Sequence, residues 1–357
     1  MQPAPDSPGN RRDAGPDEAA RTASLARFWQ PRHWPVWIGI GVLRLASLLP
    51  VRGQLALGRG LGRLLYWLLP GRRRIAAVNL ALCFPEQSAA DRQELLRRHF
   101  ESLGMTVMEQ GLAWWGSDAF IERHVELVGE EHLEAALATG RRVVLLTGHF
   151  ASQELTGRVM KLRHPTLAVL YRPSKDPMID EILRRVRGRS ASILIPKQSM
   201  RRMIRTLRNG IPVWYAPDQS HRRAMSALVP FFGEPAMTTT ALTEIVRLAD
   251  AVVVPLMPTR LRDDMAGPGA AQGARQRTRQ RTRQRTRWGR YVLEILPPVA
   301  GFPGESPVED ARRINELLEK HIRQVPEQYF WIHRRFKGRP APLPDPYAGA
   351  TDPPPAA

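Results

Sequence analysis

Six short apolar runs, separated by segments with helical patterning, constrain the fold of this chain of 357 residues more than any other feature. Runs of this length that end at glycine or proline are typical of buried strands. Strands that alternate with helices indicate βαβ units and a mainly parallel sheet flanked by helices. The sequence therefore predicts an α/β fold with strands in RRVVLLTGH, TLAVLYRP, ASILIPK, IPVWYAPD, AVVVPLMPTR and RYVLEILPPV.

Helical patterns fill the intervals between these runs. Ser88 and Asp91 form a capping box ahead of a long amphipathic segment, RQELLRRHFESLGMTVMEQGLAWW. Gly140 is expected to end the next helix, EEHLEAALATG. Further helices are predicted over 153–163, 176–187, 199–209, 238–249 and 307–324.

The composition changes along the chain and suggests its organisation. Residues 1–27 and 341–357 are rich in proline, alanine, glycine or charge and are expected to be disordered tails. The α/β domain is predicted over 75–340, with an arginine-rich insertion at 264–287 between two strands of an expected hairpin. This insertion contains three tandem RQRT units and no apolar face, which favours a mobile loop, although a nucleic-acid or heparin-like site is an alternative.

Residues 28–74 have the character of a membrane-associated helical segment. The longest stretch without a charge, residues 34–43, is shorter than the ~20 residues that a spanning helix needs, so a span would have to include Arg44. The alternatives are two amphipathic helices in the membrane interface, with tryptophans at headgroup level, or a buried hairpin of a soluble core. We expect attachment to the cytoplasmic side of a membrane; the chain start lacks the pattern of a signal peptide.

The net charge indicates the class of partner, and the cysteine count decides whether a disulfide can form. The formal net charge is +19, and the seven arginines of residues 275–287 leave +12 for the rest of the chain (19 − 7). Such an excess favours an anionic partner, which can be nucleic acid, acidic lipid or an acidic protein. The single cysteine, Cys83, excludes an intrachain disulfide and is expected in the core.

The stretch VVLLTGHFASQEL contains the first candidate for catalysis. His149 follows a predicted strand directly, at the edge where open α/β sheets usually bind ligands. Glu154 comes five residues later, and a strand-to-helix corner between them would let both side chains turn toward one point. A carboxylate on one imidazole nitrogen leaves the other nitrogen free to take a proton. The pair is therefore a candidate general-base dyad, with a structural ion pair as the alternative.

Other chemistries have no motif in this sequence. It contains no G-x-S-x-G nucleophile elbow, no P-loop, no dinucleotide fingerprint and no zinc-ligand spacing of cysteine and histidine. No metal or organic cofactor is therefore expected. The dyad would have to activate a substrate hydroxyl, which implies direct transfer without an enzyme-bound intermediate.

Four ordered stretches resemble one family. TGHFASQE is similar to the H-x-x-x-x-D/E signature of lipid acyltransferases, and YRPSKDPMID, WYAPDQSHRRAMSALVPFFGEPAMTTT and PEQYFWIHRRFK extend the likeness. Together they resemble the late acyltransferases of lipid A biosynthesis, the lauroyl (Kdo-lipid IVA) acyltransferase family. The resemblance covers residues 29–347 without the arginine-rich insertion.

This resemblance implies a function and a location. It implies an α/β enzyme at the inner membrane of a Gram-negative bacterium, with its active site on the cytoplasmic side. The donor would be acyl-acyl carrier protein, which is acidic, and the acceptor the hydroxyl of a 3-hydroxyacyl chain on the lipid A precursor. His149 matches the base of the motif and Glu154 its acid. Inner-membrane lipid is a further expected partner, and nucleic acid is not.

Further residues are candidates for binding substrate. Arg172, in YRP at a strand end, is expected to stabilise an oxyanion or bind a phosphate, unless it only pairs with Asp218 of WYAPD. Tyr171, Asp218, Arg222 and Arg223 are further candidates. Residues 333–336, HRRF, are expected either to meet phosphates at the membrane surface or to form a solvated helix face. The alternative function is another membrane glycerolipid or glycolipid acyltransferase with the same dyad.

Overall fold

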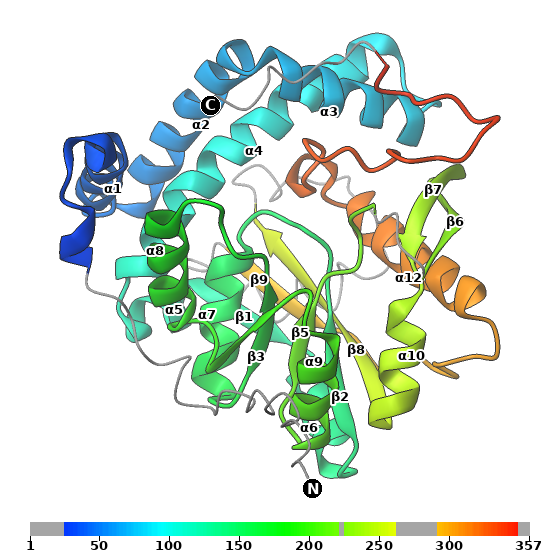
Figure 1. Ribbon diagram of the computed structural model, residues 1–357. Coiled ribbons are helices and arrows are strands. Elements are labelled where there is room, and N and C mark those ends of the chain that lie inside the picture. The colour runs from blue at the N-terminus through cyan, green and yellow to red at the C-terminus, as the bar shows by residue number, and fades with distance from the viewer. Residues whose placement is uncertain (1–24, 221–224, 262–290, 349–357) are drawn as a thin grey trace, which may run out of the picture.

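A seven-stranded sheet forms the centre of the molecule. The structure is a computed structural model that describes residues 25–220, 225–261 and 291–348. The strand order is β1-β9-β8-β2-β5-β3-β4, and helices cover both faces of the sheet (Figure 1). The strands are β1 (Val125–Val128), β2 (Arg142–Leu146), β3 (Ala168–Tyr171), β4 (Ile193–Pro196), β5 (Val213–Tyr215), β8 (Ala251–Arg260) and β9 (Tyr291–Ile295).

The strand directions confirm the predicted α/β class with a mainly parallel sheet. Strands β8, β2, β5, β3 and β4 run parallel to one another, whereas β9 is antiparallel to β8 and β1 is parallel to β9. All six predicted strands are present, and the expected hairpin is β8–β9. The predicted insertion at 264–287 lies outside the described residues, as do most of the two predicted tails. The short strand β1 was not predicted.

A separate two-stranded hairpin, β6 (Ser226–Phe231) and β7 (Glu234–Thr239), was also not predicted. Its turn consists of Phe232 and Gly233, which both have positive φ angles, as a type I′ turn requires. The prolines in both strands weaken the strand signal in the sequence. Because β7 occupies residues up to 239, helix α10 begins at Ala241 rather than at the predicted residue 238.

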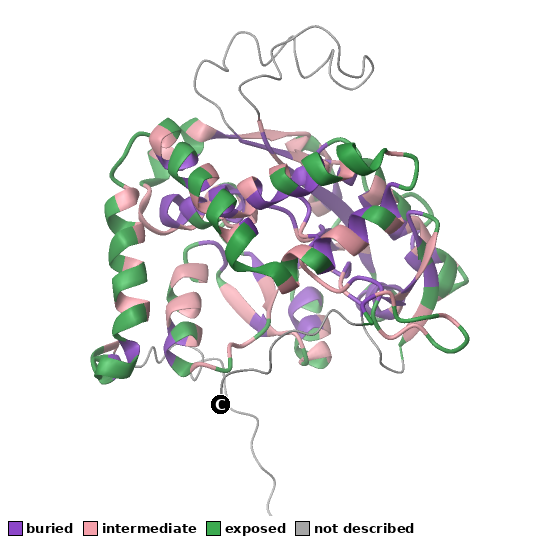
Figure 2. Ribbon diagram, turned by 90° about the horizontal axis from the view of Figure 1, so that it is seen from above, coloured by how far each residue is buried: buried purple, intermediate pink, exposed green. Residues whose placement is uncertain are grey.

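The other predicted helices are present. Ser88 caps α4 (Ala89–Trp115) through the backbone amide of Asp91, as the capping box predicts. Gly140 follows α6 with a positive φ angle. Buried residues concentrate in the central strands and on the inner sides of the helices (Figure 2). The remaining helices around the sheet are α5 (Asp118–His124), α6 (Glu130–Ala138), α7 (Gln153–Arg163), α8 (Pro177–Arg187), α9 (Met200–Arg208), α10 (Ala241–Ala249) and α12 (Pro307–Ile322).

The N-terminal segment consists of three helices, α1 (Trp34–Ala46), α2 (Val51–Leu68) and α3 (Pro70–Cys83). Helix α3 crosses the expected segment boundary at residue 74, and Cys83 at its end is fully buried, as expected. Within the described part of the chain, no helix combines the length and apolar character that crossing a membrane requires. The outer faces of α1 and α2 nevertheless carry many exposed apolar side chains.

Glycines allow α2 and α4 to approach closely. A Cβ atom at Gly104 would lie 2.1 Å from the backbone oxygen of Gly58 and 2.3 Å from the backbone nitrogen of Gly62. Neither contact can be relieved by moving a flexible side chain, because both involve backbone atoms. The two helices therefore cannot keep their spacing if Gly104 gains a side chain.

We expect Gly104→Ala to lower the free energy of unfolding by about 1–3 kcal/mol, the usual cost of overpacking. Gly60→Ala is the matched control, because a Cβ atom there has no neighbour within 4 Å. Alanine is the better helix former by up to about 1 kcal/mol, so the control should gain stability. Denaturant unfolding of both variants measures the difference, and equal effects would contradict the close packing.

Candidate active site

The carboxyl ends of three adjacent parallel strands, β2, β5 and β3, form the site. In the strand register, Leu146 of β2 lies opposite Tyr215 of β5. His149 follows Leu146 by three residues, and Asp218 follows Tyr215 by three residues, so both reach the same level beyond the sheet edge. Two chemically useful side chains that are 69 residues apart in sequence therefore meet because their strands are neighbours.

His149 and Asp218 make two hydrogen bonds. The Nδ1 of His149 lies 2.6 Å from Oδ1 of Asp218, and the backbone amide of His149 donates to Oδ2 at 2.9 Å. Asp218 is 1% exposed, whereas the His149 side chain is 31% exposed. A carboxylate can only accept, so Nδ1 carries the proton and Nε2 of the neutral ring keeps a free lone pair. The imidazole is thus oriented as a general base.

The surroundings shift the pKa values of both groups. Burial alone would lower the pKa of His149, but the charge and hydrogen bond of Asp218 outweigh burial and raise it. Burial alone would raise the pKa of Asp218, but His149 and the hydroxyl of Tyr329 hold it well below its usual range. Asp218 is therefore ionised throughout the physiological range and stabilises the protonated imidazole.

The segment around Tyr329 holds the turn that carries His149. The backbone amide of Phe330 donates to the carbonyl of His149 at 3.0 Å, and the amide of Ala151 donates to the carbonyl of Gln328 at 2.8 Å. These bonds fix both sides of the turn between β2 and α7. The sequence PEQYF is thus part of the support for the base, a role that the sequence analysis did not assign.

Glu154 does not make the predicted contact with His149. It lies in the first turn of α7, and its Oε1 is 3.3 Å from Nε of Arg187 on α8. The carboxylate that binds the imidazole is that of Asp218, at Nδ1, and not that of Glu154 as predicted. Both His149 and Glu154 still line one cavity, so the five-residue spacing brings them to one site but not to one hydrogen bond.

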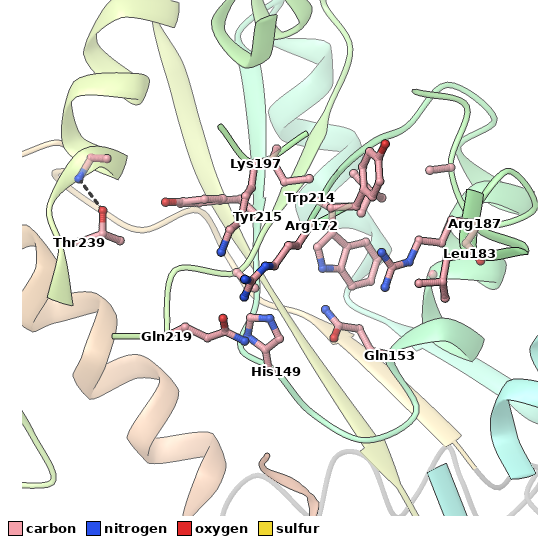
Figure 3. Close-up of a pocket in the computed structure, with 18 of the residues that line it drawn as sticks. His149, Gln153, Arg172, Leu183, Arg187, Lys197, Trp214, Tyr215, Gln219 and Thr239 are labelled. Carbon is pink, nitrogen blue, oxygen red and sulfur yellow. Dashed lines mark hydrogen bonds between the residues drawn. The ribbon is translucent and has the colours of Figure 1, made fainter. Parts of the chain in front are cut away.

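The cavity has a volume of about 590 Å³, within the range of small-molecule sites (Figure 3). Val169 and Trp214 line it and pack with the core on the α6–α7 face of the sheet. Leu170 and Tyr215 also line it but pack with the core on the α9–α10 face. The residues that line this one cavity therefore come from both sides of the sheet edge, and we call these two groups of lining residues its lobes. We define the α7–α8 lobe by Gly157, Leu183, Ala191 and Trp214, and the α9–α10 lobe by Met200, Tyr215, Met225 and Ala241.

Tyr171 is the last residue of β3, Arg172 follows it, and both line the cavity. Figure 3 shows the guanidinium group of Arg172 extending toward the imidazole of His149. The alternative pairing of Arg172 with Asp218 is not found, because both oxygens of Asp218 face His149. Arg172 is exposed and can meet a ligand. Further polar lining residues that sequence reasoning missed are Gln153, Lys197 and Gln219.

The expectations for residues 333–336 were wrong in part. Arg335 and Phe336 are buried, and Arg335 donates to Met237 and Thr238 inside the protein, so neither belongs to a solvated helix face or a phosphate site. His333 lines the cavity, with its ring centroid 5.8 Å from that of His149. Burial is the largest cause that lowers the pKa of His333, and the charge of His149 is the next. The pKa falls to about 4, so His333 stays neutral beside the base.

Two predictions remain: Arg222 and Arg223 as candidates for binding substrate, and the expectation that no metal is needed. Arg222 and Arg223 lie outside the described residues. Among the residues that the structure describes, no three histidine, cysteine or acidic side chains are grouped to hold a metal ion.

Comparisons with known proteins identify relatives over most of the chain. The family model described as bacterial lipid A biosynthesis acyltransferase matches residues 22–338. The lipid A biosynthesis lauroyltransferase of Escherichia coli (strain K12) is 37% identical over 89% of this chain and 96% of its own length. The palmitoleoyltransferase of lipid A biosynthesis from the same strain is 35% identical over 88% of this chain and 94% of its own.

Among solved structures, the 1-acyl-sn-glycerophosphate acyltransferase PlsC from Thermotoga maritima is similar at a TM-score of 0.34 and 14% identity, over 72% of this chain and 99% of that one. The family match and the relatives together decide the assignment. This chain belongs to the bacterial lipid A biosynthesis acyltransferase family and is an acyltransferase.

Proposed function

We propose that this enzyme transfers a fatty acyl chain from acyl-acyl carrier protein to the hydroxyl of a 3-hydroxyacyl chain on the lipid A precursor. The observation that carries the proposal is the His149–Asp218 pair at a cavity with apolar lobes. A lipid hydroxyl is a poor nucleophile at neutral pH, so it needs a positioned base. The names of the relatives support a lipid A precursor as the acceptor class.

The proposed reaction is direct. Nε2 of His149 takes the proton of the acceptor hydroxyl while its oxygen attacks the thioester carbonyl. Arg172 stabilises the oxyanion that forms on the carbonyl oxygen, where one aimed donor is typically worth about 10²–10³ in rate. The C–S bond then breaks, an ester remains on the acceptor, and the imidazolium returns its proton to the leaving thiolate. Asp218 stabilises the imidazolium between these two proton transfers.

The two lobes of the cavity suit a reaction between two lipids. Each lobe combines apolar side chains from the sheet with side chains from a different pair of helices. One lobe can take the donor chain while the other takes the acceptor chain that bears the hydroxyl. Glu154 and Arg187 form an ion pair on the cavity wall, and we propose that this pair holds α7 against α8 around the bound chain.

Mass spectrometry of lipid A tests the proposed acceptor. A strain that lacks this protein should make lipid A with one acyl chain fewer, and the wild-type gene should restore that chain. The same extract reports on glycerolipids and glycolipids. An unchanged lipid A together with an altered glycerolipid or glycolipid profile would favour the alternative acceptor class and contradict the proposal.

We also infer that the enzyme attaches to the cytoplasmic face of the inner membrane through helices that lie in the interface. Ile38, Val42 and Leu45 of α1 recur at helical spacing and are 60–68% exposed. On α2, Trp67 is 73% exposed. Apolar faces of this size, next to basic residues, are typical of interfacial helices.

The double variant Ile38→Ser/Leu45→Ser should lower partitioning onto anionic vesicles about 100-fold, because each large apolar side chain gains about 1.5 kcal/mol or more on burial. The matched control is Leu248→Ser/Val308→Ser, which removes exposed apolar side chains from α10 and α12. Vesicle flotation measures both variants. Equal partitioning of the two would contradict attachment through α1.

A further inference from the structure

The outer face of helix α9 is unusually basic. The helix has the sequence MRRMIRTLR, with four arginines and no acidic residue. Met203, Thr206 and Leu207 face the core, and the arginines are exposed. Arg208 donates to the carbonyl of Leu248, whereas the other three make no ion pair with any residue that the structure describes. We call the surface formed by Arg201, Arg202, Arg205 and Arg208 the α9 face.

Helix stability does not account for this arrangement. Arg201 and Arg202 lie in the first turn of α9, and that turn contains no acidic residue. Cations near a helix N-terminus oppose the helix macrodipole, each by roughly 0.3–1 kcal/mol at an exposed site. An anionic partner bound to this face would offset the unfavourable interaction between these arginines and the helix dipole.

The α9 face adjoins the cavity. Met200, the first residue of α9, lines the cavity, as does Lys197 in the turn between β4 and α9. A partner bound to α9 would therefore stand beside the cavity mouth, close enough for a thioester on a flexible arm to enter. Helices α1 and α2, which carry the exposed apolar side chains, lie at the upper left in Figure 1, whereas α9 lies at the lower centre.

The chemistry of the face favours a protein over a lipid surface. A helix that binds in a membrane interface needs an exposed apolar face as well as cations. Met203 and Leu207 of α9 are fully buried and Ile204 is partly buried, so the exposed part of the face consists mainly of guanidinium groups. Regular spacing of guanidinium groups along one helix matches an acidic helix of a soluble protein.

We propose that the α9 face is the docking site for the acidic carrier protein that delivers the acyl group. This inference rests on the proposed function, because it assumes a protein-bound donor. The charges would steer the carrier to the face and hold its thioester arm at the cavity mouth. The α9 face thus gives the enzyme separate surfaces for its soluble donor and for the membrane that holds its acceptor.

The test compares charge reversal on two faces. Arg201→Glu/Arg205→Glu changes the α9 face, and Arg123→Glu/Arg163→Glu makes the same change at exposed positions on α5 and α7. In the first variant, KM for acyl-acyl carrier protein should rise about tenfold or more, and the salt dependence of KM should weaken. KM and kcat with acyl-pantetheine, which has no carrier, should not change. The control variant should behave as wild type with both donors.

Binding of acyl-acyl carrier protein, followed by fluorescence anisotropy without acceptor, separates this inference from the proposed function. The enzyme could bind the carrier through α9 and yet fail to acylate the lipid A precursor. That result would contradict the proposed acceptor but would still support the docking site. An unchanged KM for the carrier in Arg201→Glu/Arg205→Glu would overturn the docking site. Loss of anionic vesicle binding with unchanged carrier binding would also overturn it and assign α9 to the membrane.

Discussion

Replacing His149 with alanine should lower the rate of acyl transfer by at least about 10²–10⁴, the usual contribution of a positioned general base. The reason is that no other group in the described cavity has its free nitrogen fixed by a buried carboxylate. His333 lies nearby, but burial and the charge of His149 lower its pKa to about 4, which makes it a weak base. Single-turnover transfer at saturating donor and acceptor measures the loss.

The fold of the His149→Ala variant must be intact for this result to count. Most of the cavity lining does not involve His149, so donor binding should stay close to wild type. Loss of the imidazole leaves the buried Asp218 without its partner on Oδ1, so the variant should unfold at a lower temperature but still in one cooperative transition. Retained transfer in a folded variant would contradict the assignment of His149 as the base.

Replacing Asp218 with asparagine should also lower transfer by about 10²–10⁴, although the shape of the side chain is kept. The amide is neutral, so it does not stabilise the imidazolium, and its NH₂ group can bind the ring in the wrong tautomer. Because Asp218 is buried and bonded twice to His149, no other side chain can take its place. Transfer assays on membranes that contain equal amounts of protein check the loss.

The pH dependence gives this variant a second signature. The base must be neutral to act, and Asp218 raises the pKa of His149 above its ordinary value of 6.5. Activity of the wild type should therefore rise with pH through a value above 6.5. In Asp218→Asn, burial is no longer opposed by a charge, so the pKa falls and the acid limb of kcat/KM should move to lower pH.

Glu154→Gln is the matched control for the pH profile. Glu154 pairs with Arg187 and not with His149, so its neutralisation should leave the acid limb close to the wild-type position. The interpretation of Asp218 as the partner of the base would be wrong if Glu154→Gln moved the limb and Asp218→Asn did not.

The sequence predicted single elements better than their arrangement. Each of the six apolar runs forms a strand, because a short buried run between turn residues has few other solutions. The missed hairpin β6–β7 contains Pro230 and Pro235, which remove the usual strand signal. The order of the strands depends on how helices pack over the whole sheet, and no local pattern records it.

Because the strand order could not be predicted, the sequence analysis chose Glu154 as the acid partner of His149, whereas the structure has Asp218 there. From sequence, Glu154 is the acid nearest to His149, and a turn between them allows a contact. Asp218 reaches His149 only because β5 lies next to β2, which could not be known before the strand order. The one available signal was that WYAPD, like TGH, ends a predicted strand with a polar residue.

The most direct test of the central claim is the mass of the product formed by purified enzyme from acyl-acyl carrier protein and lipid A precursor. The account predicts a precursor heavier by one ester-linked acyl chain with the wild type, and no such product with His149→Ala. A precursor that stays unacylated with the wild type, or is acylated equally well without the imidazole, would contradict it.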